Sequence, residues 1–162
     1  MPSVLIVDDL EPLRGLIRLS LEREGFQVYE ASNGREALER YRSTPVDIVL
    51  LDLTMPECDG PTTLRRFKQE FPQARTRLIL LSGDPDRAEP THIPYVNGTN
   101  GFHRTIAKPF ELQTFVELVR REYAAKAAED AGARSDLPST PASEPFGTTV
   151  PTNERVPSAG GI

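Results

Sequence analysis

Residues 46–52 read Val-Asp-Ile-Val-Leu-Leu-Asp, a short run of branched apolar residues that ends in a carboxylate. An apolar run that is nearly continuous rather than alternating is typical of a strand in a parallel sheet with both faces covered. Four further short apolar runs cover residues 4–7, 26–31, 78–81 and 105–107. The sequence therefore predicts five strands.

Helical patterns fill most intervals between these runs. After Pro12, apolar residues recur at helical spacing until Gly25, a residue type that commonly follows a helix end. The side chains expected to face inward are Leu13, Leu16, Ile17 and Leu21 in this segment; Ala37, Leu38 and Tyr41 in residues 35–42; Leu64, Phe67 and Phe71 after Pro61; and Leu112, Phe115, Val116, Val119 and Tyr123 after Phe110. Strands alternating with helices predict an α/β fold of the flavodoxin-like (βα)5 kind, a doubly wound parallel sheet with strand order 2-1-3-4-5.

One interval departs from this alternation. Between Ser82 and His103 the chain contains Pro85, Pro90, Pro94, Gly98 and Gly101. Because proline and glycine interrupt helices, we expect no regular fourth helix over residues 85–101.

Length and composition indicate one domain followed by a tail. The chain has 162 residues, which favours a single domain. Among the 31 residues of 132–162, 17 are Pro, Gly, Ser or Thr, and few are large and apolar. Such a segment cannot bury enough surface to offset its ordering entropy. We therefore expect a domain over residues 1–131 and a disordered tail over residues 132–162.

Charge and cysteine content exclude several classes of function. The formal net charge is −5, which argues against a general nucleic-acid binder. The single cysteine, Cys58, excludes an internal disulfide and a multi-thiolate zinc site, and His92 and His103 match no metal motif. No apolar run is long enough to span a bilayer, and the first residues lack the basic region of a signal peptide. We expect a cytoplasmic protein that does not contact the membrane.

Polar side chains follow the apolar runs at the points where these end. They are Asp8 and Asp9 after the first run, Asp52 after the third, Ser82 after the fourth and Lys108 after the fifth. Because parallel strands present their carboxyl ends at one edge of a sheet, we expect the five side chains to converge there. Each residue alone is more simply explained as a loop or cap residue, but their shared position favours a common site.

Three carboxylates in one crevice require positive charge. Two carboxylates about 4 Å apart repel by roughly 4 kcal/mol at an effective dielectric near 20. Lys108 and a divalent cation would together balance three carboxylates, and all-oxygen ligation with room for water favours Mg²⁺. Asp52 is then free to act as a nucleophile toward a phosphoryl group, whose three equatorial oxygens would meet the metal, Lys108 and the Ser82 hydroxyl.

Over residues 2–124 the sequence resembles the receiver domain of two-component response regulators. The resemblance lies in Val-Leu-Ile-Val-Asp-Asp (4–9), Asn-Gly-Arg-Glu-Ala-Leu (33–38), Asp-Ile-Val-Leu-Leu-Asp-Leu-Thr-Met-Pro (47–56) with Asp59-Gly60, Leu-Leu-Ser-Gly (80–83) and Ala-Lys-Pro-Phe (107–110). It implies that Asp52 accepts a phosphoryl group from a histidine kinase or a histidine phosphotransfer protein.

The resemblance also implies roles for the neighbouring residues. Mg²⁺ would be held by Asp8, Asp9, Asp52 and the backbone carbonyl of Thr54. Ser82 would be the switch hydroxyl and Lys108 the phosphate-binding lysine, and the Lys108–Pro109 bond would correspond to the family's cis peptide.

One residue and one segment depart from the family pattern. Three residues before the lysine, where the family usually has Tyr or Phe, this chain has Thr105. Threonine buries far less apolar area than an aromatic ring, so either the switch is weak or residues 85–101 reorganise on phosphorylation in place of that ring. We expect the second outcome.

The favoured interpretation is a stand-alone receiver that relays a phosphoryl group or signals through an unidentified protein partner. We expect a signalling domain that assists its own phosphoryl transfer and dephosphorylation, not an enzyme. One alternative is a receiver-like interaction module that is independent of phosphorylation, which Thr105 favours and the complete set of site residues opposes. A hydrolytic phosphatase with an aspartate nucleophile is weaker, because Thr54 stands where its acid–base aspartate would be.

Overall fold

The computed structural model describes residues 1–55, 60–83 and 103–135. Its strands form one parallel sheet in the order β2-β1-β3-β4-β5, which confirms the predicted fold and strand order. The strands are β1 (Ser3–Val7), β2 (Gln27–Ala31), β3 (Ile48–Asp52), β4 (Arg77–Ser82) and β5 (Arg104–Ala107). The helices are α1 (Glu11–Arg23), α2 (Gly34–Ser43), α3 (Gly60–Glu70) and α4 (Leu112–Ser135).

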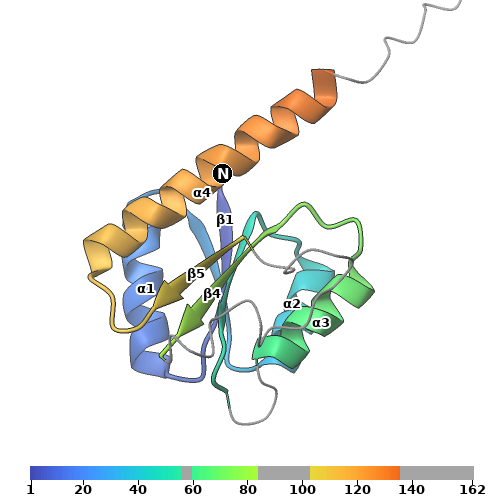
Figure 1. Ribbon diagram of the computed structural model, residues 1–162. Coiled ribbons are helices and arrows are strands. Elements are labelled where there is room, and N and C mark those ends of the chain that lie inside the picture. Colours follow the sequence, from blue (N-terminus) through green and yellow to red (C-terminus); the bar gives the residue numbers. More distant parts are fainter. Residues whose placement is uncertain (56–59, 84–102, 136–162) are drawn as a thin grey trace, which may run out of the picture.

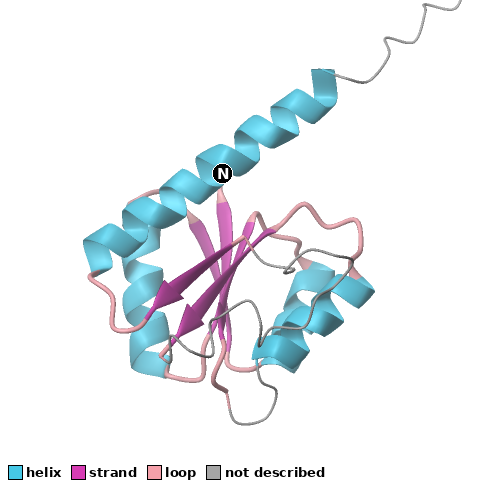
Figure 2. Cartoon of the chain, viewed as in Figure 1, coloured by secondary structure: helices cyan, strands magenta, loops and turns pink. Residues whose placement is uncertain are grey.

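Helices cover both faces of the sheet, with α1 and α4 on one face and α2 and α3 on the other (Figures 1 and 2). Successive side chains of a strand point to opposite faces, and in β1 both sets are buried. Val4 and Ile6 pack with side chains from α1 and α4, whereas Leu5 and Val7 pack with side chains from α2 and α3. The nearly continuous apolar runs of the sequence follow from this two-sided burial.

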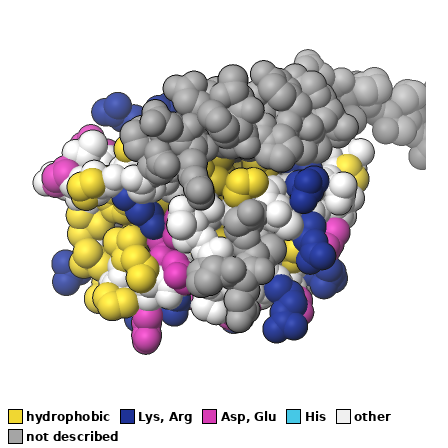
Figure 3. All heavy atoms as spheres, turned by 60° about the horizontal axis from the view of Figure 1, so that its bottom comes forward, with side chains coloured by type: hydrophobic (Ala, Val, Ile, Leu, Met, Phe, Trp, Pro, Cys, Tyr) yellow, Lys and Arg dark blue, Asp and Glu magenta, His cyan; other side chains and the backbone are white. Residues whose placement is uncertain are grey.

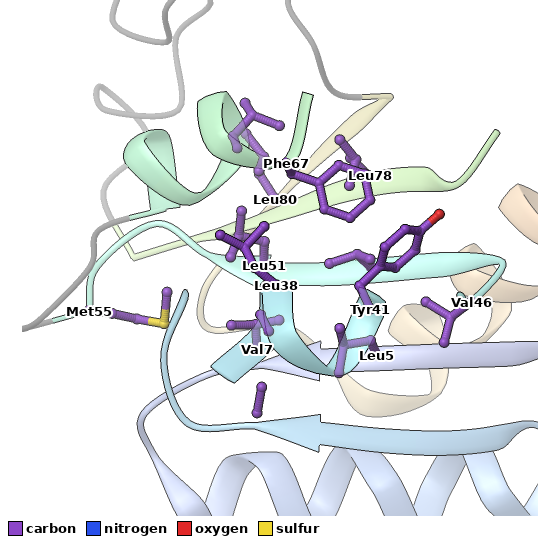
Figure 4. Packing of buried hydrophobic residues seen from close by; sticks show 14 of the residues in the cluster. Leu5, Val7, Leu38, Tyr41, Val46, Leu51, Met55, Phe67, Leu78 and Leu80 are labelled. Carbon is purple, nitrogen blue, oxygen red and sulfur yellow. The ribbon is translucent and has the colours of Figure 1, made fainter. Parts of the chain in front are cut away.

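The face under α2 and α3 packs around aromatic rings (Figure 4). Tyr41 of α2 lies edge-on to Phe67 of α3, with ring centroids 4.5 Å apart. The buried Tyr41 hydroxyl lies 2.6 Å from the hydroxyl of Thr76, which in turn donates to the carbonyl oxygen of Val46. This packing anchors both helices over β3 and β4, the strands that carry Asp52 and Ser82 at their ends.

The structure corrects one inward-facing residue of the first helical pattern. Ile17 and Leu21 are buried as expected and Leu13 is partly buried, but Leu16 is 50% exposed. Neighbouring helical residues differ by about 100° in direction, so with Ile17 facing the sheet Leu16 turns to solvent. Gly25 follows the end of α1 with a φ of 84°, a left-handed conformation that glycine adopts without steric cost.

The last helix is longer than the sequence pattern indicates. It reaches Ser135, four residues past the expected boundary at 131. Residues 124–133 include six alanines, the strongest helix former, and this propensity continues the helix after its apolar stripe has ended. The interpretations of residues 85–101 and of residues 136–162 lie outside the described residues. Within the described ranges, no helix is long and apolar enough to cross a membrane.

Candidate metal centre at the carboxyl edge of the sheet

Strand pairing brings the five predicted side chains to one edge of the sheet. Asp52 and Ser82 are the last residues of the adjacent strands β3 and β4, and Asp8 directly follows β1, the neighbour of β3 on its other side. Ser82 pairs with Ala107 of β5, and the N–H of the next residue, Lys108, donates to the Ser82 carbonyl oxygen at 2.7 Å. The strand ends that carry these residues therefore lie at one edge of the sheet, as the confirmed strand order requires.

Three carboxylates from two strand ends form a compact oxygen cluster. Carboxylate oxygens of Asp8, Asp9 and Asp52 all lie within 4.8 Å of one another. Asp8 is fully buried and Asp52 is 4% exposed, while Asp9 is exposed. Oxygens on opposite sides of a bound Mg²⁺ are about 4.2 Å apart, so the cluster matches the size of a hard divalent cation with oxygen ligands. Figure 3, which turns this edge forward, shows acidic side chains gathered near the middle of the face.

Lys108 supplies positive charge to this cluster. Its Nζ lies 2.7 Å from Asp8 Oδ2 and 3.4 Å from Asp52 Oδ2. The peptide bond between Lys108 and Pro109 is cis, as the resemblance implies. One ammonium among three carboxylates leaves an excess of two negative charges, which suits a divalent cation.

The pKa of Asp52 lies above its ordinary value, mainly because the carboxyl is buried. Burial raises the pKa of the Asp52 carboxyl, and the Asp8 carboxylate acts in the same direction. The N–H of Thr54, which donates to Asp52 Oδ1 at 3.1 Å, and the Lys108 ammonium oppose the rise without cancelling it. A bound cation would favour the ionised carboxylate that nucleophilic attack requires.

The predicted roles of the Thr54 carbonyl oxygen and of the Ser82 hydroxyl remain predictions. Thr54 is an exposed residue just after β3, and its observed contact with Asp52 uses its N–H, not the carbonyl expected to hold the metal. Ser82, the last residue of β4, is buried, and its expected role as the switch hydroxyl stays a prediction. Thr105 lies half-buried in β5.

Two residues that shape the site were not assigned a role from the sequence. A Cβ on Gly60 would lie 2.6 Å from both the Asp52 carbonyl oxygen and Leu53 Cα, so no side chain fits without backbone movement. The guanidinium of Arg14 donates to the Asp8 carbonyl oxygen at 2.8 Å. The Asp59-Gly60 pair in the sequence could have indicated Gly60. The contact of Arg14 with Asp8 depends on tertiary structure, so the sequence does not indicate it.

Comparisons with known proteins agree with this geometry. The response regulator receiver domain family matches residues 4–120. Chemotaxis protein CheY of Bacillus subtilis (strain 168) is 35% identical over 119 residues, which cover 73% of this chain and 94% of CheY. Transcriptional regulatory protein SrrA of Staphylococcus aureus (strain NCTC 8325 / PS 47) is 36% identical over 121 residues, which cover 73% of this chain and 46% of SrrA. The chain thus spans about half the length of SrrA.

A solved structure gives the same fold. The response regulator protein TrrA from Thermotoga maritima, in complex with Mg²⁺-BeF, has a TM-score of 0.63 and 25% identity. The match covers 75% of this chain and 99% of TrrA. From its sheet order, its acidic cluster and these matches, the chain belongs to the family of response regulator receiver domains of two-component systems.

Proposed function

We propose that Asp52 accepts a phosphoryl group from a histidine kinase or a histidine phosphotransfer protein, at a site where Asp8, Asp9, Asp52 and the Thr54 carbonyl hold Mg²⁺. The observation that carries this proposal is the oxygen cluster within 4.8 Å, which has one lysine to balance three carboxylates. The Mg²⁺-BeF complex of TrrA supports the same combination of metal and phosphoryl-like group.

The residues divide the transfer step among them. A carboxylate oxygen of Asp52 forms the bond to phosphorus while the bond from phosphorus to the donor's histidine nitrogen breaks, and its electron pair leaves with the donor. Lys108, 3.4 Å from Asp52, is placed to bind one phosphoryl oxygen, and the Ser82 hydroxyl another. When bound, Mg²⁺ neutralises charge on the phosphoryl oxygens.

The phosphorylated domain would then signal through contacts with a downstream protein in the cytoplasm. The formal charge of −5 supports a protein partner rather than a nucleic acid. The alternative is a receiver-like module whose partner binding does not depend on phosphorylation. The observation that favours it is the half-buried Thr105 in β5, which offers no aromatic ring to move with Ser82.

Intact-mass measurement after treatment with acetyl phosphate and Mg²⁺ tests the proposal. One added phosphoryl group is expected on the wild-type chain, none after chelation of the metal, and none on Asp52→Asn. Lys108→Ala should label more slowly, because a phosphoryl oxygen loses its fixed cationic partner. Asp47→Asn is the matched control, since this aspartate lies at the opposite edge of the sheet, and it should label like wild type.

Two results would contradict the proposal. Labelling of Asp52→Asn at the wild-type rate would place the acceptor elsewhere. A folded wild-type chain that takes up no phosphoryl group would favour the phosphorylation-independent module.

A further inference from the structure

The three carboxylates of the site are held in different ways. Asp8 pairs with Lys108, and Asp52 accepts from the Thr54 N–H and also lies near Lys108. The Asp9 side chain has no hydrogen bond or ion pair with any residue that the structure describes, and the residue is exposed. The position of the Asp9 carboxylate therefore depends on the backbone that carries it.

That backbone is fixed on both sides of Asp8. The Asp8 N–H donates to the Ala31 carbonyl oxygen at 3.2 Å, and the Asp8 carbonyl oxygen accepts from Arg14 Nη1 at 2.8 Å. The Asp8 carbonyl belongs to the planar peptide unit that leads into Asp9. Holding this carbonyl orients the peptide plane and so sets the direction in which Asp9 leaves it.

Arg14 is itself held in one orientation. Its Nε donates to Glu30 Oε1 at 3.0 Å, and its side chain is only 15% exposed. A planar guanidinium that donates in two directions at once has little freedom to rotate. Glu30 offsets part of the charge of Arg14, because the same carboxylate also pairs with Arg18.

We propose that Arg14 is a positioning residue for Mg²⁺ binding. It acts through the Asp8 carbonyl to present the Asp9 carboxylate, and it touches neither the metal nor the phosphoryl group. This inference rests on the metal site of the proposed function. Lysine cannot replace arginine here, because an ammonium lacks the rigid fork that reaches Glu30 and the Asp8 carbonyl together.

Two matched variants separate this role from a general effect of charge. Arg18 forms an ion pair with the same Glu30, with its Nε 3.1 Å from Oε2, but among the described residues it donates no hydrogen bond to the Asp8 backbone. Arg14→Gln and Arg18→Gln therefore remove the same charge from neighbouring turns of α1, and only Arg14→Gln releases the Asp8 carbonyl. Arg14→Lys keeps the charge and loses the two-directional contact.

The measurement is the Mg²⁺ dissociation constant by titration calorimetry, with urea unfolding in EDTA to establish that each variant is folded. Loss of an outer partner of a metal ligand typically weakens metal binding by 10–100-fold, and we expect about 10-fold for Arg14→Gln. Arg14→Lys should be weakened to a similar degree, while Arg18→Gln should bind as wild type does. In EDTA, the backbone amide signals of Asp9 and Leu10 should already be displaced in Arg14→Gln and unchanged in Arg18→Gln.

Three outcomes would overturn the inference. Equal affinity of wild type and Arg14→Gln would remove the positioning role and leave the proposed function intact. Equal weakening in Arg14→Gln and Arg18→Gln would assign the effect to charge rather than to the Asp8 carbonyl. A wild-type chain that binds no Mg²⁺ would instead overturn the proposed metal site together with this inference.

Discussion

The two edges of the sheet both gather charged side chains, but they balance them differently. At the amino edge, Glu122 of α4 accepts from Arg77 at 3.2 Å and from Arg104 at 2.6 Å, and Lys126 lies 3.0 Å from Asp47. Glu122 and Asp47 thus each have at least one cationic partner. At the carboxyl edge, three carboxylates share a single lysine.

The pKa values of one aspartate at each edge move in opposite directions. Burial alone would raise the pKa of Asp47, but hydrogen bonds from Lys126 and Ser3 outweigh it and hold the pKa below its ordinary value. At Asp52, the effect of burial exceeds the opposing effects of the Thr54 N–H and the Lys108 ammonium, so the pKa rises. Ion pairs at the amino edge thus attach α4 to the sheet, whereas three carboxylates beside one lysine at the carboxyl edge leave negative charge for an added cation.

Removing an acid from the amino edge should cause the largest loss of stability. Glu122 is 6% exposed, and Glu122→Gln keeps the size of the side chain. The substitution leaves the half-exposed Arg104 and the mostly buried Arg77 without the charge of Glu122. Breaking a buried ion pair costs about 3–5 kcal/mol. We expect about 3 kcal/mol, because Arg77 retains Glu129, as measured by urea unfolding without divalent cations.

The same substitution on the exposed side of α4 provides the control. Glu117 pairs with Arg121 at 3.7 Å, and both side chains are mostly exposed. Exposed pairs of this spacing contribute about 0.3–0.5 kcal/mol, so Glu117→Gln should change little. Similar losses for both variants would mean that the amino-edge network stabilises no more than a surface pair does.

The two aspartates should respond to pH with opposite signs. A lowered folded-state pKa at Asp47 adds stability above the unfolded value near 3.8, and this stability is lost as pH falls through the folded pKa. A raised pKa at Asp52 means that stability is lost as pH rises through the folded value. Without divalent cations at pH 7, Asp47→Asn should therefore destabilise the chain and Asp52→Asn should stabilise it, each by about 1 kcal/mol.

Unfolding of both variants at pH 7 and near pH 4 checks these signs. The Asp52→Asn difference should shrink toward pH 4, because the pH then falls through the raised pKa of Asp52. The Asp47→Asn difference should largely persist near pH 4, because the folded-state pKa of Asp47 lies below 3.8. Destabilisation by Asp52→Asn at pH 7 would show that Lys108 and the Thr54 N–H compensate the buried carboxylate fully, and that this edge is not short of positive charge.

The sequence was sufficient for those features that follow from local pattern and sheet topology. Continuous apolar runs predicted the strands, and the acidic and basic residues at their ends predicted the cluster, because parallel strands share one carboxyl edge. The contact of Arg14 with the Asp8 carbonyl could not be predicted in this way. It depends on how α1 docks against β2, which no spacing in the sequence specifies.

Two details failed for local physical reasons. Leu16 fitted the apolar spacing of α1, but a helix on one face of a sheet buries a narrower stripe than that spacing allows, and Leu16 lies outside it. The domain boundary at residue 131 was placed from the composition of residues 132–162, and α4 continues past it. Alanine propensity and the ion pairs of Lys126 and Asp130 carry the helix on to Ser135.

Truncation of the chain should produce the smallest change in stability. It should also show where the contacts of α4 with the amino edge of the sheet end. Removing residues 136–162 should leave the urea midpoint unchanged, because their composition favours no packed structure and the ion pair between Asp130 and Arg75, at 3.4 Å, lies before them. Ending the chain after Ala125 also removes Lys126 and its pair with Asp47, and should cost about 1 kcal/mol. A large loss from the first truncation would show that residues 136–162 pack on the domain, and the predicted disordered tail would then be wrong.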